Sequence, residues 1–576
     1  MFEKKFWHNK RIFILLVTTL VLCFVLTVHL VIVMIFRAQY YSDRATDVHQ
    51  RERNIKAARG MIVDRNGVIL ASNETVCNIS VIHSQITEPE RVIEILSREL
   101  EISEDAVRKR VEKFSSIEKI KSNVDKETGD RIRDYGLAGV KVDEDYKRYY
   151  PYGNLASKVL GFTGGDNQGI VGLEVKYDAN LAGTNGKILT ITDAHGVEIE
   201  GKEENRKEPV AGMNLVTTID YNIQTYAQQL AEKAMIEKEA KQVCIIVMNP
   251  KNGEILAMVN TPEYDLNTPY VLNYETDIST GTKEYQDALN KMWRNFCIND
   301  TYEPGSTFKM VVSTAALETG AVSLSSSFTC SGSTIVEDRR IRCHKTTGHG
   351  TQNFTQTVMN SCNPAFIEWG RRVGVDNFYK YVGKLGLLDK TGVDLPGEAS
   401  TIIHKKENVG PVELATMSFG QSFQITPLAL LRAASAIVNG GTLVTPHFAI
   451  RSENSDQSQV IEYEYETIPA SIEKETSDTM RQVLYQVVNE GGGHLAKVEG
   501  FTIGGKTATS QKLPRGNSKY FASFIGFAPV EDPQLIAMCI IDEPTGVYYG
   551  GTIAAPVIGQ LFENILPNYI DKQVEK

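Results

Sequence analysis

The sequence predicts an α+β protein with a single N-terminal transmembrane helix, a long first domain, and a C-terminal domain whose sheet is flanked by helices. Three observations predict this fold class. One long apolar run lies near the N-terminus, strand patterns begin and end residues 240-570, and helical patterns fill the middle of that segment. At 576 residues, the chain is also too long for one core and should divide into several domains.

Residues 12-36 form an apolar run broken only by small hydroxyl residues and His29. A helix of this length would be about 37 Å long, enough to cross about 30 Å of hydrocarbon. The run is longer than the apolar part of a usual signal peptide, and no Ala-x-Ala site follows it, so we predict an uncleaved signal anchor in the cell membrane. A cytoplasmic tail, residues 1-11, and an extracytoplasmic remainder are predicted from four preceding cations, Lys4, Lys5, Lys10 and Arg11.

The net charge of −10 argues against a nucleic-acid partner. Proteins that bind nucleic acid concentrate Lys and Arg on one surface, because they must replace the counterions around the phosphates. This chain has no basic domain that would offset its acidity, which we attribute to solubility.

The region after the membrane helix has the patterns of a mixed domain. Asn66-Gly67 lies between alternating apolar residues and predicts a tight β-hairpin, and Asn185-Gly186 predicts another. Residues 88 to 115 are charged and periodic, which indicates two amphipathic helices. Residues 215-220 are typical of a strand that ends at Asp220, an N-cap for a helix of about 20 residues.

The strand patterns change character from residue 243 onward. Residues 243-248 and 255-259 predict a hairpin across an Asn-Pro-Lys-Asn-Gly turn, and strands are predicted again near 521-527 and 535-541. Because helical patterns separate the two pairs, we expect one sheet that combines both ends of the segment.

Ser306 follows Glu303-Pro304-Gly305 and begins an apolar helix. Unpaired N–H groups and the positive end of the helix dipole favour negative charge there. Lys309 falls one turn later on the same face. A lysine can deprotonate a serine only when it is neutral, through burial or a nearby cation such as Lys506. Taken alone, the pair is better explained by a helix cap and a surface lysine, and only the two further motifs favour a catalytic pair.

Two further motifs follow in the order expected of a serine acyltransferase with a lysine base. In Ser361-Cys362-Asn363, the serine can pass a proton and the asparagine can bind a substrate amide, although a helix cap before proline gives the same pattern. Lys506-Thr507-Ala508-Thr509 follows two glycines in a strand pattern. A strand edge can pair with a peptide backbone while Lys506, Thr507 and Thr509 receive a carboxylate.

These motifs, with Arg59-Gly60, Asp64-Arg65-Asn66-Gly67 and Tyr549-Gly550-Gly551, resemble those of class B penicillin-binding proteins. These are monofunctional peptidoglycan D,D-transpeptidases of division, elongation or sporulation. The resemblance implies a pedestal, or dimerisation-type, domain over 37-235. It also implies a penicillin-binding transpeptidase domain over 240-570 with a serine β-lactamase-like fold.

The resemblance also implies roles for individual residues. Ser306 would be acylated by D-Ala-D-Ala and trapped by β-lactams, with Lys309 as base, Ser361 as proton relay and Asn363 as amide binder. Lys506, Thr507 and Thr509 would hold the terminal carboxylate, and the N–H groups of Ser306 and Thr509 would form the oxyanion hole. The chemistry would require no cofactor. Ala508 departs from the family, which usually has glycine there, and its methyl group would narrow the groove.

The segment before residue 243 lacks the paired-glutamate helix pattern that we associate with glycosyltransferase domains. The resemblance therefore implies a separate, multispanning glycan polymerase as a membrane partner. The alternative function is a catalytically weak scaffold, or a β-lactam-binding sensor, that activates such a polymerase.

Eight cysteines are present, and two of them, together with a nearby histidine, suggest a metal site. Cys330, Cys343 and His349 lie shortly before Ser361, and thiolates with imidazole suit a structural zinc ion, which prefers four ligands. Asp300 or His344 would be the fourth ligand. A Cys330–Cys343 disulfide and unpaired thiols are the alternatives.

Overall fold

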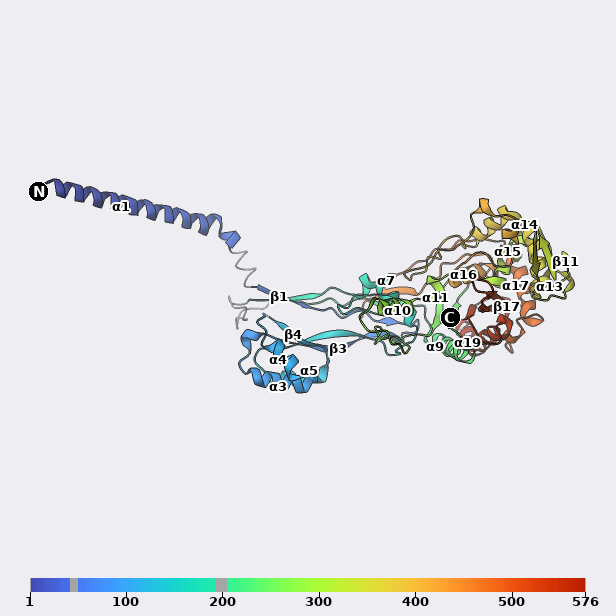
Figure 1. Ribbon diagram of the computed structural model, residues 1–576, viewed down its shortest axis with the longest axis horizontal. Helices are drawn as coiled ribbons and strands as arrows, with labels where there is room; N and C mark the ends of the chain where they lie inside the picture. The colour runs from blue at the N-terminus through green and yellow to red at the C-terminus, as the bar shows by residue number, and fades with distance from the viewer. Residues whose placement is uncertain (1, 42–49, 116, 192–204, 575–576) are drawn as a thin grey trace. The chain divides into compact units, whose positions relative to one another are not determined.

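The computed structural model describes residues 2–41, 50–115, 117–191 and 205–574 (Figure 1). The chain forms two compact units, each built from segments that are separate in the sequence. The first contains residues 1–58, 75–147 and 184–210, and the second contains 59–74, 148–183 and 211–576. Parts of the predicted pedestal region therefore belong to the same compact unit as the predicted transpeptidase domain.

The N-terminal apolar run is helical throughout. Helix α1 (Phe2–Val31) continues into the short π-helix η1 (Ile32–Phe36), and residues Ile12–Phe36 are long and apolar enough to cross a membrane. The hydroxyls of Thr19 and Thr27 donate to carbonyls four residues earlier, at 2.8 and 2.7 Å. Because these hydroxyls are paired within the helix, they do not oppose its burial in lipid.

The first unit has an α+β core. Residues 75–81 of β3 (Ile69–Val81) pair with β4 (Glu118–Asp125), and β3 also pairs with β5 (Val140–Tyr149). The predicted pair of amphipathic helices is confirmed as α3 (Pro89–Leu100) and α4 (Glu104–Val111), which lie with α5 (Lys126–Asp134) beside these strands in Figure 1. Their apolar residues pack with Cys77, Ile79 and Val81 of β3.

A three-stranded sheet completes this unit, from β1 (Gln50–Ile55), β6 (Gly186–Ile191) and β7 (Asn205–Lys207). Here one prediction was wrong, because Asn185-Gly186 is not a hairpin turn. Gly186 is the first residue of β6, and a Cβ there would lie 2.5 Å from the Lys207 carbonyl oxygen. The glycine is therefore required by the close approach of another backbone segment.

The second unit begins with a small sheet. Strand β2 (Ile62–Val63) pairs with β3 across the predicted Asn66-Gly67 turn and runs parallel to β8 (Asn214–Thr217). Strands β15 (Ala449–Glu453) and β16 (Val460–Glu462) extend it. After β8, the Asp220 side chain accepts hydrogen bonds from two backbone N–H groups of α9 (Tyr221–Glu237), which confirms the predicted N-cap.

The principal sheet has the strand order β10-β9-β19-β18-β17 and is antiparallel. It therefore combines both ends of the segment, as predicted. Its strands are β9 (Gln242–Met248), β10 (Ile255–Thr261), β17 (Gly504–Gln511), β18 (Tyr520–Ala528) and β19 (Leu535–Asp542).

Alternate residues of β9 belong to two different cores. Ile245 and Val247 pack with α9 and α19 (Ala555–Val574), which lie side by side on one face of the sheet (Figure 1). Ile246 and Met248 face the larger core, which contains the helices of the middle segment. The sheet is thus covered on both faces, and the period of two along a strand sends successive side chains to opposite cores.

The remaining elements of the second unit include helices of 4 to 22 residues and two-stranded ribbons. The helices are α6 (Ser157–Leu160), α7 (Gly172–Lys176), α8 (Asp178–Leu181), α10 (Lys283–Trp293), α11 (Phe296–Asn299), α12 (Lys309–Glu318), α13 (Phe354–Met359), α14 (Asn363–Lys384), α15 (Pro411–Met417), α16 (Pro427–Val438), α17 (Lys474–Asn489) and α18 (Gly550–Ile553). The ribbons pair β11 (Ser327–Cys330) with β14 (Gly350–Asn353) and β12 (Ser333–Val336) with β13 (Arg339–Arg342).

A buried charge cluster joins distant segments of the second unit. The Glu174 carboxylate on α7 accepts from Arg59 Nε at 2.6 Å and from Arg148 Nε at 2.7 Å, and all three side chains are buried. Arg59 also pairs with Asp178 at 2.7 Å. The two guanidinium groups share one carboxylate in a buried environment. Loss of the Glu174 charge would therefore leave both buried cations without the negative charge that they share.

We predict that Glu174→Gln lowers the free energy of unfolding of the second unit by about 3–5 kcal/mol. The matched control is Asp532→Asn, which removes the exposed Lys251–Asp532 pair and should cost less than about 1 kcal/mol. Urea unfolding of the full chain in detergent, followed by tryptophan fluorescence, measures both. Equal effects would contradict a structural role for the cluster.

Candidate functional site

Ser306 lies on a tightly held turn. The 3-10 turn η3 (Gly305–Phe308) leads directly into α12, and Ser306 is half-buried on it. Gly305 has φ +58°, in the region that favours glycine, and its N–H donates to the Gly420 carbonyl at 2.9 Å. The Ser306 hydroxyl forms no hydrogen bond with any residue that the structure describes, so it is free to meet a substrate.

Glu303 connects this turn to strand β17. Its backbone carbonyl accepts from Ser510 Oγ at 2.9 Å, and its carboxylate accepts from the Ser422 N–H at 2.9 Å and from Arg515 at 2.5 Å. The turn that carries Ser306 is therefore held both to the sheet and to the loop at residues 420–422.

The Lys309 amine is buried beside the second motif. Its Nζ donates to the Ser361 carbonyl at 2.7 Å, to Ser361 Oγ at 3.1 Å and to Asn363 Oδ1 at 2.7 Å. No carboxylate among the described residues pairs with it. Burial, and then the charge of Lys506, hold the pKa of Lys309 well below its ordinary value. The structure thus brings together Lys309, Ser361 and Asn363 and favours a neutral amine.

Ser361 and Asn363 lie in the short connection between α13 and α14. Ser361 has φ +48°, which is uncommon for a residue with a side chain. Such a conformation costs about 1–3 kcal/mol and persists only where the surrounding structure enforces it. Asn363 is the first residue of α14, ahead of Pro364. This backbone conformation turns both polar side chains toward the Lys309 amine.

Strand β17 pairs only with β18 and is thus an edge of the principal sheet within the described chain. Lys506 is fully buried, and burial lowers its pKa to about 7, while its Nζ donates to the Thr507 carbonyl at 3.0 Å. Ala508 is on the same face of the strand, and its methyl carbon lies 3.6 Å from where a Cβ on Gly305 would be. The methyl group therefore faces the turn that carries Ser306.

Thr507 and Thr509 point to the opposite face of β17. The Thr509 hydroxyl accepts from the Gly550 N–H at 3.0 Å, and the Thr507 methyl carbon lies 3.3 Å from where a Cβ on Gly551 would be. The structure consequently does not bring these two side chains to the same face as Lys506, because neighbouring residues of a strand alternate. Their predicted role in binding a carboxylate stays a prediction.

Four potential metal ligands converge beside Ser361. The ligand atoms of Cys330, Cys343, His349 and Cys362 all lie within 4.8 Å of one another, and Cys343 Sγ is 3.6 Å from His349 Nδ1. The three cysteines are buried, and all eight cysteines of the chain are unbridged. A hydrogen bond from Cys362 lowers the pKa of the Cys343 thiol, and burial lowers that of His349.

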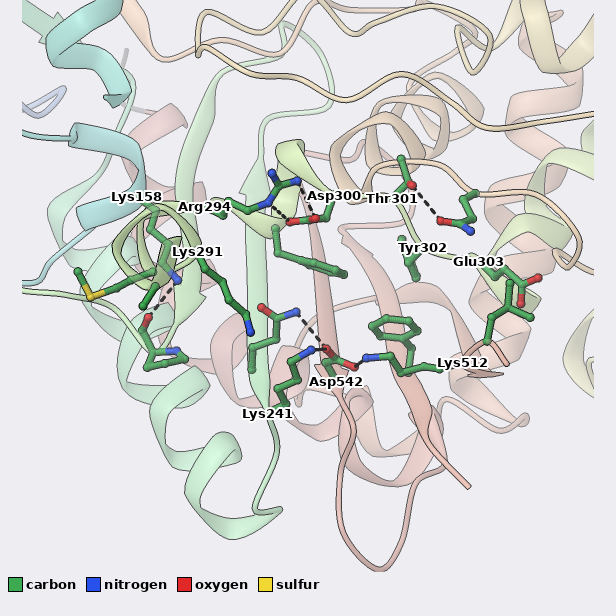
Figure 2. Close-up of a pocket in the computed structure, with 18 of the residues that line it drawn as sticks. Lys158, Lys241, Lys291, Arg294, Asp300, Thr301, Tyr302, Glu303, Lys512 and Asp542 are labelled. Carbon is green, nitrogen blue, oxygen red and sulfur yellow. Dashed lines mark hydrogen bonds and ion pairs between the residues drawn. The ribbon is translucent and has the colours of Figure 1, made fainter. Parts of the chain in front are cut away.

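Asp300, predicted as a fourth ligand, requires a correction. Its carboxylate pairs with Arg294 at 2.8 Å and lines a separate cavity, in which Figure 2 shows the pair. Cys362 completes the group instead, while His344 lies beside it, with Nδ1 3.8 Å from Cys343 Sγ. The sequence shows Cys362 between Ser361 and Asn363. The spacing of residues does not indicate, however, that its side chain lies near Cys330 and Cys343.

Two family models match the chain. Residues 243–563 match the penicillin binding protein transpeptidase domain, and residues 54–217 match the penicillin-binding protein dimerisation domain. Neither matched model describes a glycosyltransferase domain.

Curated relatives match nearly the whole chain. Stage V sporulation protein D of Bacillus subtilis is 37% identical over 569 residues, which cover 97% of this chain and 86% of the relative. The probable peptidoglycan D,D-transpeptidase PenA of Neisseria meningitidis is 29% identical over 519 residues, covering 88% of this chain and 84% of the relative. Among solved structures, penicillin binding protein 2X from Streptococcus thermophilus has a TM-score of 0.75 at 23% identity, covering 90% of this chain and 81% of that chain, and so has the same fold.

The contact between α18 and β17 yields a prediction. A Cβ on Gly550 would lie 2.1 Å from the Ala508 carbonyl oxygen and 2.4 Å from that of Ser523. Because both are backbone atoms, Gly550→Ala must displace α18 and should cost about 1–3 kcal/mol. A Cβ on Gly492 would meet nothing within 4 Å, so Gly492→Ala is the matched control. Thermal unfolding should show a lower midpoint for Gly550→Ala only, and equal midpoints would disprove the close contact.

Proposed function

Because this chain belongs to the penicillin-binding protein transpeptidase family, we propose that it cross-links peptidoglycan stem peptides through an ester on Ser306. The observation that carries the proposal is the buried Lys309 amine, which has no carboxylate partner and contacts Ser361 and Asn363. A buried amine with a lowered pKa is suited to accept a proton at neutral pH. A scaffold or sensor without catalysis would not require this arrangement.

In the first step, Ser306 Oγ attacks the carbonyl carbon between the two terminal D-Ala residues while its proton passes to Lys309 Nζ. The N–H groups of Ser306 and Thr509 would stabilise the resulting oxyanion, where the loss of one donor typically costs about 3–4 kcal/mol. The C–N bond then breaks, and the proton travels from Lys309 through the Ser361 hydroxyl, 3.1 Å away, to the departing D-Ala amine.

In the second step, the amine of another stem peptide attacks the ester carbonyl and loses a proton to Lys309. The bond to Ser306 Oγ then breaks, and Lys309 returns the proton to that oxygen. Asn363 would hold the amide of the donor peptide in both steps, whereas Lys506, Thr507 and Thr509 would hold its terminal carboxylate only until D-Ala leaves in the first step. If Lys506 carries its positive charge when substrate binds, that charge also disfavours protonation of Lys309. A β-lactam would form the same ester with Ser306.

A cysteine and histidine set of this kind fits zinc, which binds thiolate and imidazole in tetrahedral sites. We propose that Cys330, Cys343, His349 and Cys362 hold a structural zinc ion. Cys362 lies between Ser361 and Asn363, so a metal there would help enforce the unusual Ser361 backbone and would keep both side chains directed at Lys309. The transpeptidation steps do not pass through the metal.

The membrane arrangement is also a proposal. Cations before residue 12 support a cytoplasmic N-terminus and an extracytoplasmic catalytic domain. Helix α1, with its apolar side chains exposed, is the proposed contact for a multispanning glycan polymerase, because neither matched family model supplies a polymerase domain.

We predict that benzylpenicillin adds its mass to the peptide that contains Ser306 when the full chain is treated in detergent. Ser306→Ala should abolish the adduct, and Lys309→Met should slow its formation by at least about a hundredfold, the low end of typical general-base effects. Ser313→Ala, on the same helix, is the matched control and should label normally. If mass spectrometry finds no adduct on Ser306 in the unaltered chain, the catalytic proposal fails and the scaffold alternative is favoured.

We predict that the full chain, purified without chelators, contains about one zinc ion per molecule. Cys362→Ser should remove most of it, because serine is a poor zinc ligand. Asp300→Asn should leave the zinc content unchanged, since Asp300 pairs with Arg294. Elemental analysis measures the metal. Absence of zinc, or its loss only in Asp300→Asn, would contradict the proposed ligand set.

A further inference from the structure

A cavity of about 650 Å³ lies in the second unit, next to the turn that carries Ser306. Tyr302 and Glu303 line it immediately before that turn, and Gln511 and Lys512 line it where β17 ends. Glu303 contacts β17 through the Ser510 hydroxyl, and the cavity therefore lies beside the end of that strand, beyond Thr509. The transpeptidation mechanism above does not use it.

The cavity has a surplus of positive charge. Five cations line it together with three carboxylates, and the cations are Lys158, Lys241, Lys291, Arg294 and Lys512. Each carboxylate already has a cationic partner, because Asp300 pairs with Arg294, Asp542 with Lys512 at 2.6 Å, and Glu303 with Arg515.

Two of the lysines are not paired with a carboxylate. Lys158 Nζ donates to the carbonyls of Asn260 and Pro262, at 2.8 and 3.0 Å, which leaves one N–H for a ligand. The side-chain ammonium of Lys291, on α10, has no hydrogen bond or ion pair with any described residue, and the side chain is exposed. In Figure 2 its ammonium points into the space between the Arg294–Asp300 pair and the group formed by Lys241, Asp542 and Lys512.

The cavity also has apolar surface. Met292, Phe296 and Phe521 contribute to its wall, so it can accept an aliphatic chain as well as an anion. An acidic residue of a peptide provides both an aliphatic chain and a carboxylate. The carboxylate forms strong, charge-assisted hydrogen bonds with lysine.

The direction of the donor peptide follows from the proposed function, on which this inference rests. Its terminal carboxylate would lie near Lys506 and its reacting carbonyl near Ser306 and Thr509. The preceding residues must then run antiparallel to β17, toward Gln511. At about 3.3 Å per extended residue, the second residue before the terminal dipeptide would lie roughly 7 Å farther along, toward Gln511 and Lys512, which line the cavity.

We propose that this cavity is a subsite for an acidic residue of the donor stem peptide, one or two positions before its terminal D-Ala-D-Ala. Lys291 binds the carboxylate, with Lys158 as a second donor. The subsite makes the enzyme selective for donors whose carboxylate is free and not amidated, because an amide cannot form an ion pair with Lys291.

Two synthetic donor peptides that end in D-Ala-D-Ala test this proposal. They are identical except that one has a free carboxylate and the other a carboxamide at the residue before the terminal dipeptide or the one preceding it. Mass spectrometry after rapid quenching follows formation of the acyl-enzyme on the full chain in detergent. This readout isolates the donor step, because no acceptor amine is added.

The unaltered chain should react about tenfold faster with the acid than with the amide, the ratio expected for roughly 1.4 kcal/mol. Lys291→Met should bring that ratio close to one, and Lys291→Glu should reverse it. Lys283→Met is the matched control, since Lys283 is exposed on the same helix but does not line the cavity, and it should keep the ratio of the unaltered chain. Unchanged thermal unfolding of the Lys291 variants excludes misfolding as the cause.

Equal rates with the two donors, or an unchanged ratio in Lys291→Met, would overturn the subsite. A preference that arises only when an acceptor amine is present would assign the cavity to the acceptor and also overturn the donor assignment. Benzylpenicillin separates this failure from that of the proposed function. A Ser306 adduct without donor discrimination removes only the subsite, whereas the lack of an adduct removes the acyl-enzyme on which both depend.

Discussion

The burial of the Lys309 amine is the constraint on which the catalytic arrangement depends. A lysine in water is almost entirely protonated at neutral pH and cannot accept a proton from a serine. Here the amine is surrounded by the Ser361 carbonyl and hydroxyl and by Asn363, with no carboxylate to stabilise its charge. Removing water and placing a second buried lysine nearby both favour the neutral form. The cost of burying this polar group is offset by its hydrogen bonds with Ser361 and Asn363.

The sheet allows these groups to meet. Strand β17 is held in place by β18 and by α18, whose Gly550 lies against the strand backbone, so the Lys506 side chain can be buried on the opposite face. Glu303 then joins the Ser306 turn to Ser510 of the same strand. Ser306, the two lysines and the edge of the sheet are thus positioned through contacts that involve the backbone and tolerate little movement.

The cysteine and histidine group holds the connection that carries Ser361 and Asn363. Ser361 adopts a backbone conformation that few residues with side chains adopt, and Cys362 follows it directly. A ligand set that includes Cys362 links this connection to β11 through Cys330, and to the segment beyond β13 through Cys343 and His349. The cavity beyond β17 likewise combines segments that are distant in the sequence. Its two lysines that pair with no carboxylate lie on α6 and α10, which are remote in sequence from the proposed catalytic motifs.

The sequence by itself determined the membrane helix, the order of strands and helices, and the three motifs, because each is a local pattern of polarity or residue type. The Asp220 cap and the Asn66-Gly67 turn were predictable for the same reason. Only the tertiary structure decided that Asn185-Gly186 is no turn and that Thr507 and Thr509 face α18. It also decided that Asp300 pairs with Arg294, while Cys362 lies with Cys330, Cys343 and His349. These outcomes depend on which distant backbones approach one another and on how each strand is registered against its neighbour, and neither is recorded in the spacing of residues along the chain.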